Sequence, residues 1–256
     1  QHEAAGQALS TLKEMAPPES ALCALTSAAL CLEQEDYPGV LTALEGFAPA
    51  HAQARVQGLA LRGAALLHTG QPGPASSALE EARQLALEWS QTHLQGGGSV
   101  VGEWMGVQAL VWLAEAHLAL EQPKEALQVL ESQGANSLRR PGPSPNLSSW
   151  AAHFEYGFLS ITVGADSGIA LAMDKTGKVH GQSIPLGRAT LWRAIGHLEQ
   201  AARAGSDDRA RKLGAELARA LLPVGLIKNL RASEHPGRLL LILHGPLEAL
   251  PVQLLV

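Results

Sequence analysis

The stretch FLSITVGADSGIALAMDKTGKVHGQSIPLG, from Phe158 to Gly187, determines the fold class of the second part of the chain. Apolar and polar residues alternate in three runs, Phe158–Val163, Ile169–Met173 and Val179–Ile184, and this alternation predicts β-strands. Turn residues separate the runs, and the sequence DKTG between the second and third runs is typical of a tight turn. The stretch therefore predicts an antiparallel meander.

Two helices and a second kind of strand are expected after the meander. Apolar residues recur with helical spacing at about 190–204 and at about 208–222. A short segment, 226–232, leads to Leu239–Leu243, five apolar residues in succession, as in strands that helices cover on both faces. A strand of this kind opens a parallel sheet, and no other run in the chain reads as its parallel partner. We therefore expect a second polypeptide, or sequence beyond residue 256, to complete the sheet.

The first part of the chain is expected to be a helical repeat. Three segments, beginning at Ser27, Arg62 and Leu113, share one spacing: a small residue on a first helix, a small or β-branched residue twelve positions later, and a leucine four beyond that. Small side chains let two helices cross closely, and the larger ones fill the space one turn away. The positions are Ala28, Val40 and Leu44, then Gly63, Ala75 and Leu79, then Ala114, Ala126 and Leu130.

The first two segments lie 35 residues apart, close to the period of tetratricopeptide repeats, which they resemble across about 20–135. The third follows after 51 residues, and the sequence GGGS at 96–99, natural or engineered, lies in that longer interval. A generic helical bundle is the alternative. The proline-rich stretch RRPGPSPNLSS forbids helix and predicts a connector at 139–149. The expected domains are 1–138, with helical repeats, and 150–256, with the meander and the opening portion of an incomplete α/β domain, so the overall fold class is α+β.

The composition excludes several classes of protein. Residues 1–150 contain 7 Lys and Arg against 15 Asp and Glu, and residues 151–256 contain 12 against 9. The acidic first part argues against nucleic acid as its partner. No run of about 18 apolar residues predicts a membrane span. Cys23 and Cys31 lie without a CxxC motif and read as reduced core thiols, so the expected location is cytoplasmic.

The order of elements resembles the opening of a CHAT domain, a caspase-like peptidase module that often follows tetratricopeptide repeats. The resemblance covers about Trp150 to Val256 and includes the closing sequence LLLILHGPLEALPVQLL. In that sequence an apolar strand is followed by His244–Gly245, a spaced leucine at Leu247, the pair Leu250–Pro251 and an apolar helix. The position of His244 is more often aspartate in the family, a departure that makes His244 a variant turn residue. Separases, which also join a helical array to a caspase-like domain, are the related alternative.

The resemblance implies a cysteine endopeptidase whose catalytic histidine and cysteine lie on later strands, outside this chain. Residues 1–256 alone are then expected to be inactive, with a protein or peptide partner on the repeats. A non-catalytic adaptor with a degenerate caspase-like fold is the alternative function. Reading the sequence after Val256 for a histidine at one strand end and a cysteine at the next would distinguish the two.

The chain itself offers no complete active site, cofactor site or metal site. It has no GxSxG elbow, no HExxH and no phosphate loop, and its histidines lack metal-ligand spacing. His68 and His117 fall on first helices and are expected to be packed residues. His244 and Gly245 form a turn at the carboxyl end of a strand, where ligands bind in open α/β sheets. We therefore predict that these two residues lie beside a cleft, with His244 more typical of a structural turn residue than of a catalytic one.

Overall fold

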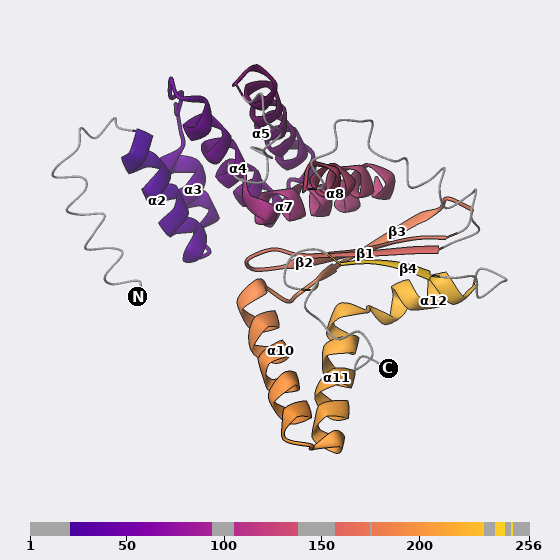
Figure 1. The fold of residues 1–256 in the computed structure, drawn as a ribbon. Helices are drawn as coiled ribbons and strands as arrows, with labels where there is room; N and C mark the ends of the chain where they lie inside the picture. The colour runs from indigo at the N-terminus through magenta and orange to yellow at the C-terminus, as the bar shows by residue number, and fades with distance from the viewer. Residues whose placement is uncertain are drawn as a thin grey trace. The chain divides into compact units, whose positions relative to one another are not determined.

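The computed structural model describes residues 21–93, 105–137, 157–174, 176–232, 239–243 and 247. It combines helices with one four-stranded sheet, which confirms the predicted α+β class (Figure 1). The chain divides into two compact units between Leu120 and Glu121. The connector predicted at 139–149 lies outside the described residues.

The described part of the first unit consists of helices, with short loops between α2 and α3 and between α4 and α5. Its described helices are α2 (Ala21–Glu33), α3 (Tyr37–Ala43), α4 (Ala52–His68), α5 (Pro72–His93) and α7 (Gly106–Ala119). Helices α2 and α3 pack together, as do α4 and α5. The loop between α2 and α3 ends on Asp36, whose carboxylate accepts a hydrogen bond of 3.0 Å from the Gly39 N–H and caps α3.

The predicted repeat spacing coincides with the buried positions of the helices. All nine residues singled out by that spacing are buried. Ala28, Val40 and Leu44 form the core between α2 and α3. Gly63 on α4 lies directly against Leu79 on α5, because a Cβ atom on Gly63 would be 2.4 Å from the Leu79 Cγ. Small residues thus stand where these helices cross, for the packing reason that the sequence suggested.

The second unit is built around the sheet. Its described elements are α8 (Pro123–Ser137), β1 (Gly157–Val163), β2 (Gly168–Met173), β3 (Val179–Ile184), α10 (Arg188–Arg203), α11 (Asp207–Leu221), α12 (Val224–Ala232) and β4 (Leu239–Leu243). The predicted meander is confirmed, since β1, β2 and β3 pair antiparallel in sequence order. Helix α8 groups with the sheet, although the sequence analysis placed it in the repeat domain.

The expectation that Leu239–Leu243 has no parallel partner in this chain is wrong. Strand β4 pairs parallel with β1, with Leu239 opposite Gly157 and Leu243 opposite Ile161. The described sheet therefore has the order β3-β2-β1-β4, and between the two parallel strands the chain passes through β2, β3 and the helices α10, α11 and α12. The alternating pattern of β1 did not identify it as the partner, because that pattern is typical of an antiparallel strand.

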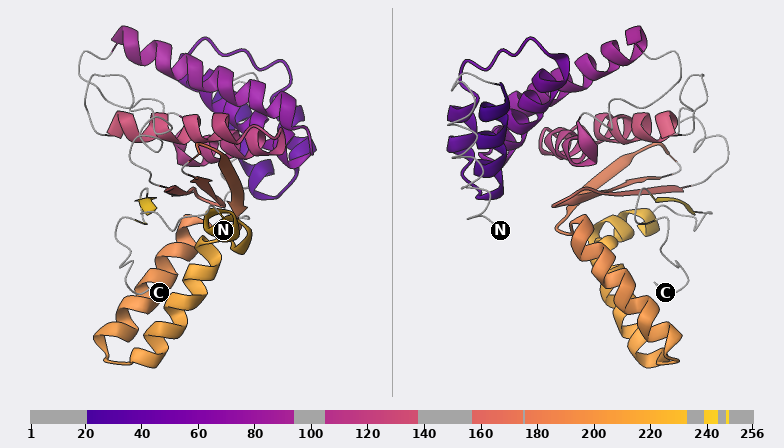
Figure 2. Two further views of the ribbon diagram at one scale, coloured as in Figure 1. Left: turned by 90° about the vertical axis from the view of Figure 1, so that its right-hand side faces the viewer. Right: turned by 60° about the vertical axis from the view of Figure 1, so that its left-hand side comes forward.

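Both faces of the central strands are buried. One face of β1, with Leu159, Ile161 and Val163, packs with α10, α11 and α12. The opposite face carries Phe158, and α8 lies on that side of the sheet while α12 lies on the other (Figures 1 and 2). Strand β4 is less covered than predicted: residues 241–243 are only half-buried, because β4 is an edge strand among the described strands.

The turn between β2 and β3 is held by one carboxylate. Asp174 Oδ1 accepts hydrogen bonds from the Thr176 N–H at 2.8 Å, the Thr176 hydroxyl at 2.5 Å and the Lys178 N–H at 3.0 Å. Burial raises the pKa of Asp174, but these hydrogen bonds and the nearby His180 outweigh it, so the pKa lies below its ordinary value of 3.8. Gly177 has a φ of +80°, which closes the predicted DKTG turn.

Asp174→Asn is expected to destabilise the second unit by about 1 kcal/mol at pH 7, because the ionised form of this carboxyl is the better acceptor. A lowered folded-state pKa contributes stability above the unfolded-state pKa, and this contribution is lost as the pH falls through the folded-state pKa. The stability difference between wild type and variant should therefore shrink below pH 3.8. Urea unfolding of both proteins at pH 7 and at lower pH measures this difference in the free energy of unfolding. Asp208→Asn, at an exposed position, is the control, and a difference independent of pH would contradict the prediction.

Candidate functional site

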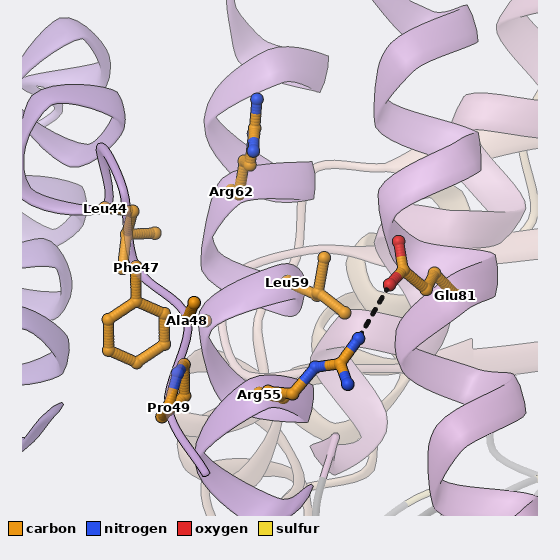
Figure 3. Close-up of a pocket in the computed structure, with 9 residues that line it drawn as sticks. Leu44, Phe47, Ala48, Pro49, Arg55, Leu59, Arg62 and Glu81 are labelled. Carbon is orange, nitrogen blue, oxygen red and sulfur yellow. Dashed lines mark hydrogen bonds and ion pairs between the residues drawn. The ribbon is translucent and has the colours of Figure 1, made fainter.

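The clearest candidate site is a pocket in the first unit. Its volume is about 360 Å³, and it lies between the loop that follows α3 and the side of α4, with one residue from α5. The lining residues are Leu44, Phe47, Ala48, Pro49, Arg55, Gly58, Leu59, Arg62 and Glu81. The pocket thus combines an apolar wall with three charged side chains (Figure 3).

Local sequence places the apolar wall. Helix α3 ends at Ala43, and Gly46, with a φ of +67°, turns the chain so that Phe47 and Pro49 run beside α4. The Phe47 ring rests on Gly58, where a Cβ atom would lie 2.5 Å from the ring carbon Cε1. Glycine at this position therefore lets the ring approach the α4 backbone. Leu59 on α4 extends the apolar surface across the pocket (Figure 3).

The charged side chains of the pocket are not balanced. Arg55 and Glu81 form an ion pair of 3.3 Å, and both side chains are about half exposed, 48% and 53%. Arg62 is exposed and makes no ion pair with any residue that the structure describes. Figure 3 shows it extended away from the Arg55–Glu81 pair. The pocket therefore has a net charge of +1, and Arg62 is the guanidinium with unused donors.

Sequence reasoning did not identify this pocket. A signal was present, because Arg55, Leu59 and Arg62 are spaced i, i+4, i+7 and share one side of a helix. The other half of the site comes from the loop at 44–49, and no helical or strand periodicity indicates where such a loop packs. The pocket depends on a contact between two elements, which residue spacing on one element cannot show.

His244 and Gly245 lie outside the described residues, which reach Leu243 at the end of β4 and include Leu247. Leu247 is fully buried and packs in the core under the sheet with residues of α10, α11 and α12. The position of His244 beside a cleft therefore stays a prediction.

The two cysteines lie in the helical unit as thiols. Cys23 is buried in α2, and Cys31 is half-buried against the core of α2 and α3. The predicted core placement is thus correct for both. His68 stacks on Tyr37, with ring centroids 4.8 Å apart and planes within 12°, so its ring is packed as expected.

Within the described part of the chain, no group of three or more metal-ligating side chains comes together. No helix among the same residues is long and apolar enough to cross a membrane. Comparison of the chain with models of known families, with curated proteins and with solved structures found no match.

Proposed function

We propose that the chain is a protein-interaction scaffold whose helical first unit binds a peptide segment of a partner protein. The observation that carries this proposal is the pocket of about 360 Å³ between α4 and the loop after α3. Its volume falls in the range of ligand sites, and it combines an apolar wall with a few polar groups that can fix the orientation of a ligand. The tetratricopeptide-like spacing supports the same function, because helical repeats of this kind bind peptides and neighbouring domains.

The packing of the two helices α4 and α5 supports this function as well. The pocket rests on α4 and α5, whose crossing is filled by Gly63 and Leu79 without space between them. A rigid helical surface lowers the conformational entropy lost on binding, which favours recognition of an extended peptide. The side chains that project from it, Arg55, Leu59 and Arg62, supply polar and apolar contacts in one place.

A selection of randomised displayed peptides on the purified 256-residue chain tests the scaffold function. We expect enriched peptides that protect backbone amides of α3, α4 and α5 from hydrogen exchange when they bind. Failure to enrich any peptide, or protection confined to the second unit, would contradict it.

A second candidate function is the one implied by the CHAT resemblance, a caspase-like cysteine endopeptidase. The observation that favours it is the parallel pairing of β4 with β1 in one sheet, since the resemblance implies that later strands follow the strand Leu239–Leu243. In this proposal the catalytic histidine and cysteine come from outside residues 1–256. The open edge of β4 would be the place where further strands add.

The protease proposal makes an expectation about the isolated chain. Cys23 and Cys31 pack in the helical unit, so residues 1–256 alone should not cleave peptides. A fluorogenic peptide library measures this, with Cys23→Ser and Cys31→Ser as controls. Cleavage that disappears in either variant would refute a dyad outside the chain. A covalent cysteine-protease probe on the protein as it occurs in cells then separates the protease, which is labelled at a third cysteine, from the adaptor, which is not.

A further inference from the structure

We infer that the pocket binds a carboxylate side chain of the partner peptide at Arg62, with a neighbouring apolar side chain of the same peptide against Phe47 and Leu59. This inference rests on the proposed scaffold function and specifies the chemistry of its ligand. The partner segment is therefore a short extended peptide in which an aspartate or glutamate adjoins an apolar residue.

The charge of the pocket selects an acidic ligand. Residues 1–120 contain 4 Lys and Arg against 12 Asp and Glu, so this unit is strongly acidic. Two of those four cations, Arg55 and Arg62, line this one pocket. The negative charge of the unit therefore repels an acidic peptide in general, whereas the two arginines of the pocket attract it locally. Arg62, without an ion-pair partner among the described residues, is the guanidinium available to a carboxylate.

The spacing along α4 suits an extended peptide. Arg55 and Arg62 are seven residues apart on one helix, which corresponds to a rise of about 10 Å. Leu59 lies between them, and the Phe47 ring faces the same pocket from the loop (Figure 3). Three residues of an extended chain cover about 10 Å, so adjacent residues of a peptide can reach the cation and the apolar wall together.

The net charge further favours a carboxylate over a phosphate. Glu81 neutralises one of the two guanidinium groups through its 3.3 Å ion pair with Arg55. The remaining charge of +1 matches a monoanionic carboxylate. A phosphate group carries about two negative charges at neutral pH and would leave one of them unmatched in a unit that is otherwise acidic. A glutamate peptide should therefore bind more tightly than its phosphoserine counterpart.

The test uses the full 256-residue chain and the fluorescein-labelled peptide Gly-Ser-Leu-Glu-Phe-Ser-Gly, followed by fluorescence anisotropy. Two matched peptides replace the glutamate by glutamine or by phosphoserine. We expect the glutamine peptide to bind about tenfold more weakly, as for the loss of one charge-assisted hydrogen-bonded pair. Equal affinity of the glutamine peptide, tighter binding of the phosphoserine peptide, or no binding of the glutamate peptide would overturn the inference.

Two variants locate the binding in this pocket. Arg62→Glu reverses the charge at an exposed position and should lower the affinity for the glutamate peptide by at least about tenfold. Gly58→Ala adds a Cβ atom 2.5 Å from the Phe47 ring and should displace the apolar wall. The affinity for all three peptides should therefore fall. Lys124→Glu makes the same charge change at an exposed residue that does not line the pocket, and it should leave affinity unchanged. Circular dichroism confirms that each variant is folded.

The inference and the scaffold function can fail separately. If displayed peptides bind the first unit but are insensitive to both Arg62→Glu and Gly58→Ala, the scaffold function stands and the pocket assignment is wrong. If no displayed peptide binds the first unit, the scaffold function itself is contradicted.

Discussion

Gly187→Ala is expected to lower the free energy of unfolding of the second unit by about 2 to 3 kcal/mol. Gly187 is the N-cap of α10, and a Cβ atom there would lie 2.2 Å from the Ala165 carbonyl oxygen. That oxygen belongs to the backbone of the loop between β1 and β2, which is held by hydrogen bonds from the Arg188 N–H to the Gly164 and Ala165 carbonyls at 2.9 and 3.1 Å. The backbone cannot move aside without breaking these bonds.

Gly196→Ala is the matched control for this prediction, because it lies in the same helix. No atom lies within 4 Å of the position that its Cβ would occupy. Alanine in a helix interior is favoured over glycine, so this variant should gain about 0.5 to 1 kcal/mol. Chemical unfolding of both variants measures the contrast. A Gly187→Ala variant as stable as wild type would show that the loop does not pack on the start of α10 as the structure has it.

Gly63→Ala should destabilise the first unit by about 1 to 2 kcal/mol, even though alanine is the better helix former. The new Cβ would lie 2.4 Å from Cγ of Leu79, which is fully buried. The crossing of α4 and α5 would have to widen. Thermal or chemical unfolding of the variant provides the measurement.

The contact with Leu79 can be isolated by a double-mutant cycle. In a Leu79→Ala background the obstructing side chain is absent, so Gly63→Ala should become neutral or stabilising. Gly196→Ala, inside α10 with open space around its Cβ position, controls for the change in helix propensity. An unchanged cost of Gly63→Ala in the Leu79→Ala background would place the strain elsewhere.

Sequence periodicity located most of the secondary structure. The three strands of the meander were predicted within a residue of β1, β2 and β3, and the helices at about 190–204 and 208–222 correspond to α10 and α11. Helices α10 and α11 are amphipathic, so their apolar residues recur with the helical period and mark the buried face. Strands β1 and β2 are buried on both faces, so the turn residues between the runs were what bounded them in the sequence. The fold class followed from their order.

Contacts between distant segments were harder to predict. The pairing of β4 with β1 joins residues about eighty positions apart, and no local pattern specifies such a partner. Helix α8 has the spacing of a repeat helix, yet it groups with the sheet unit. The pocket likewise requires the loop at 44–49 to meet α4, and its candidate residues were therefore missed.

By itself the sequence determined where the helices α10 and α11 and the strands β1, β2 and β3 lie, because side-chain spacing and turn residues are local properties. It also determined the small residues at the crossing of α4 and α5, since close packing of two helices demands them. Only the tertiary structure decided that β1 is the parallel partner of β4 and that Phe47 and Arg62 share a pocket. Both depend on packing between elements, where many alternative pairings satisfy the same local pattern and only the complete core selects among them.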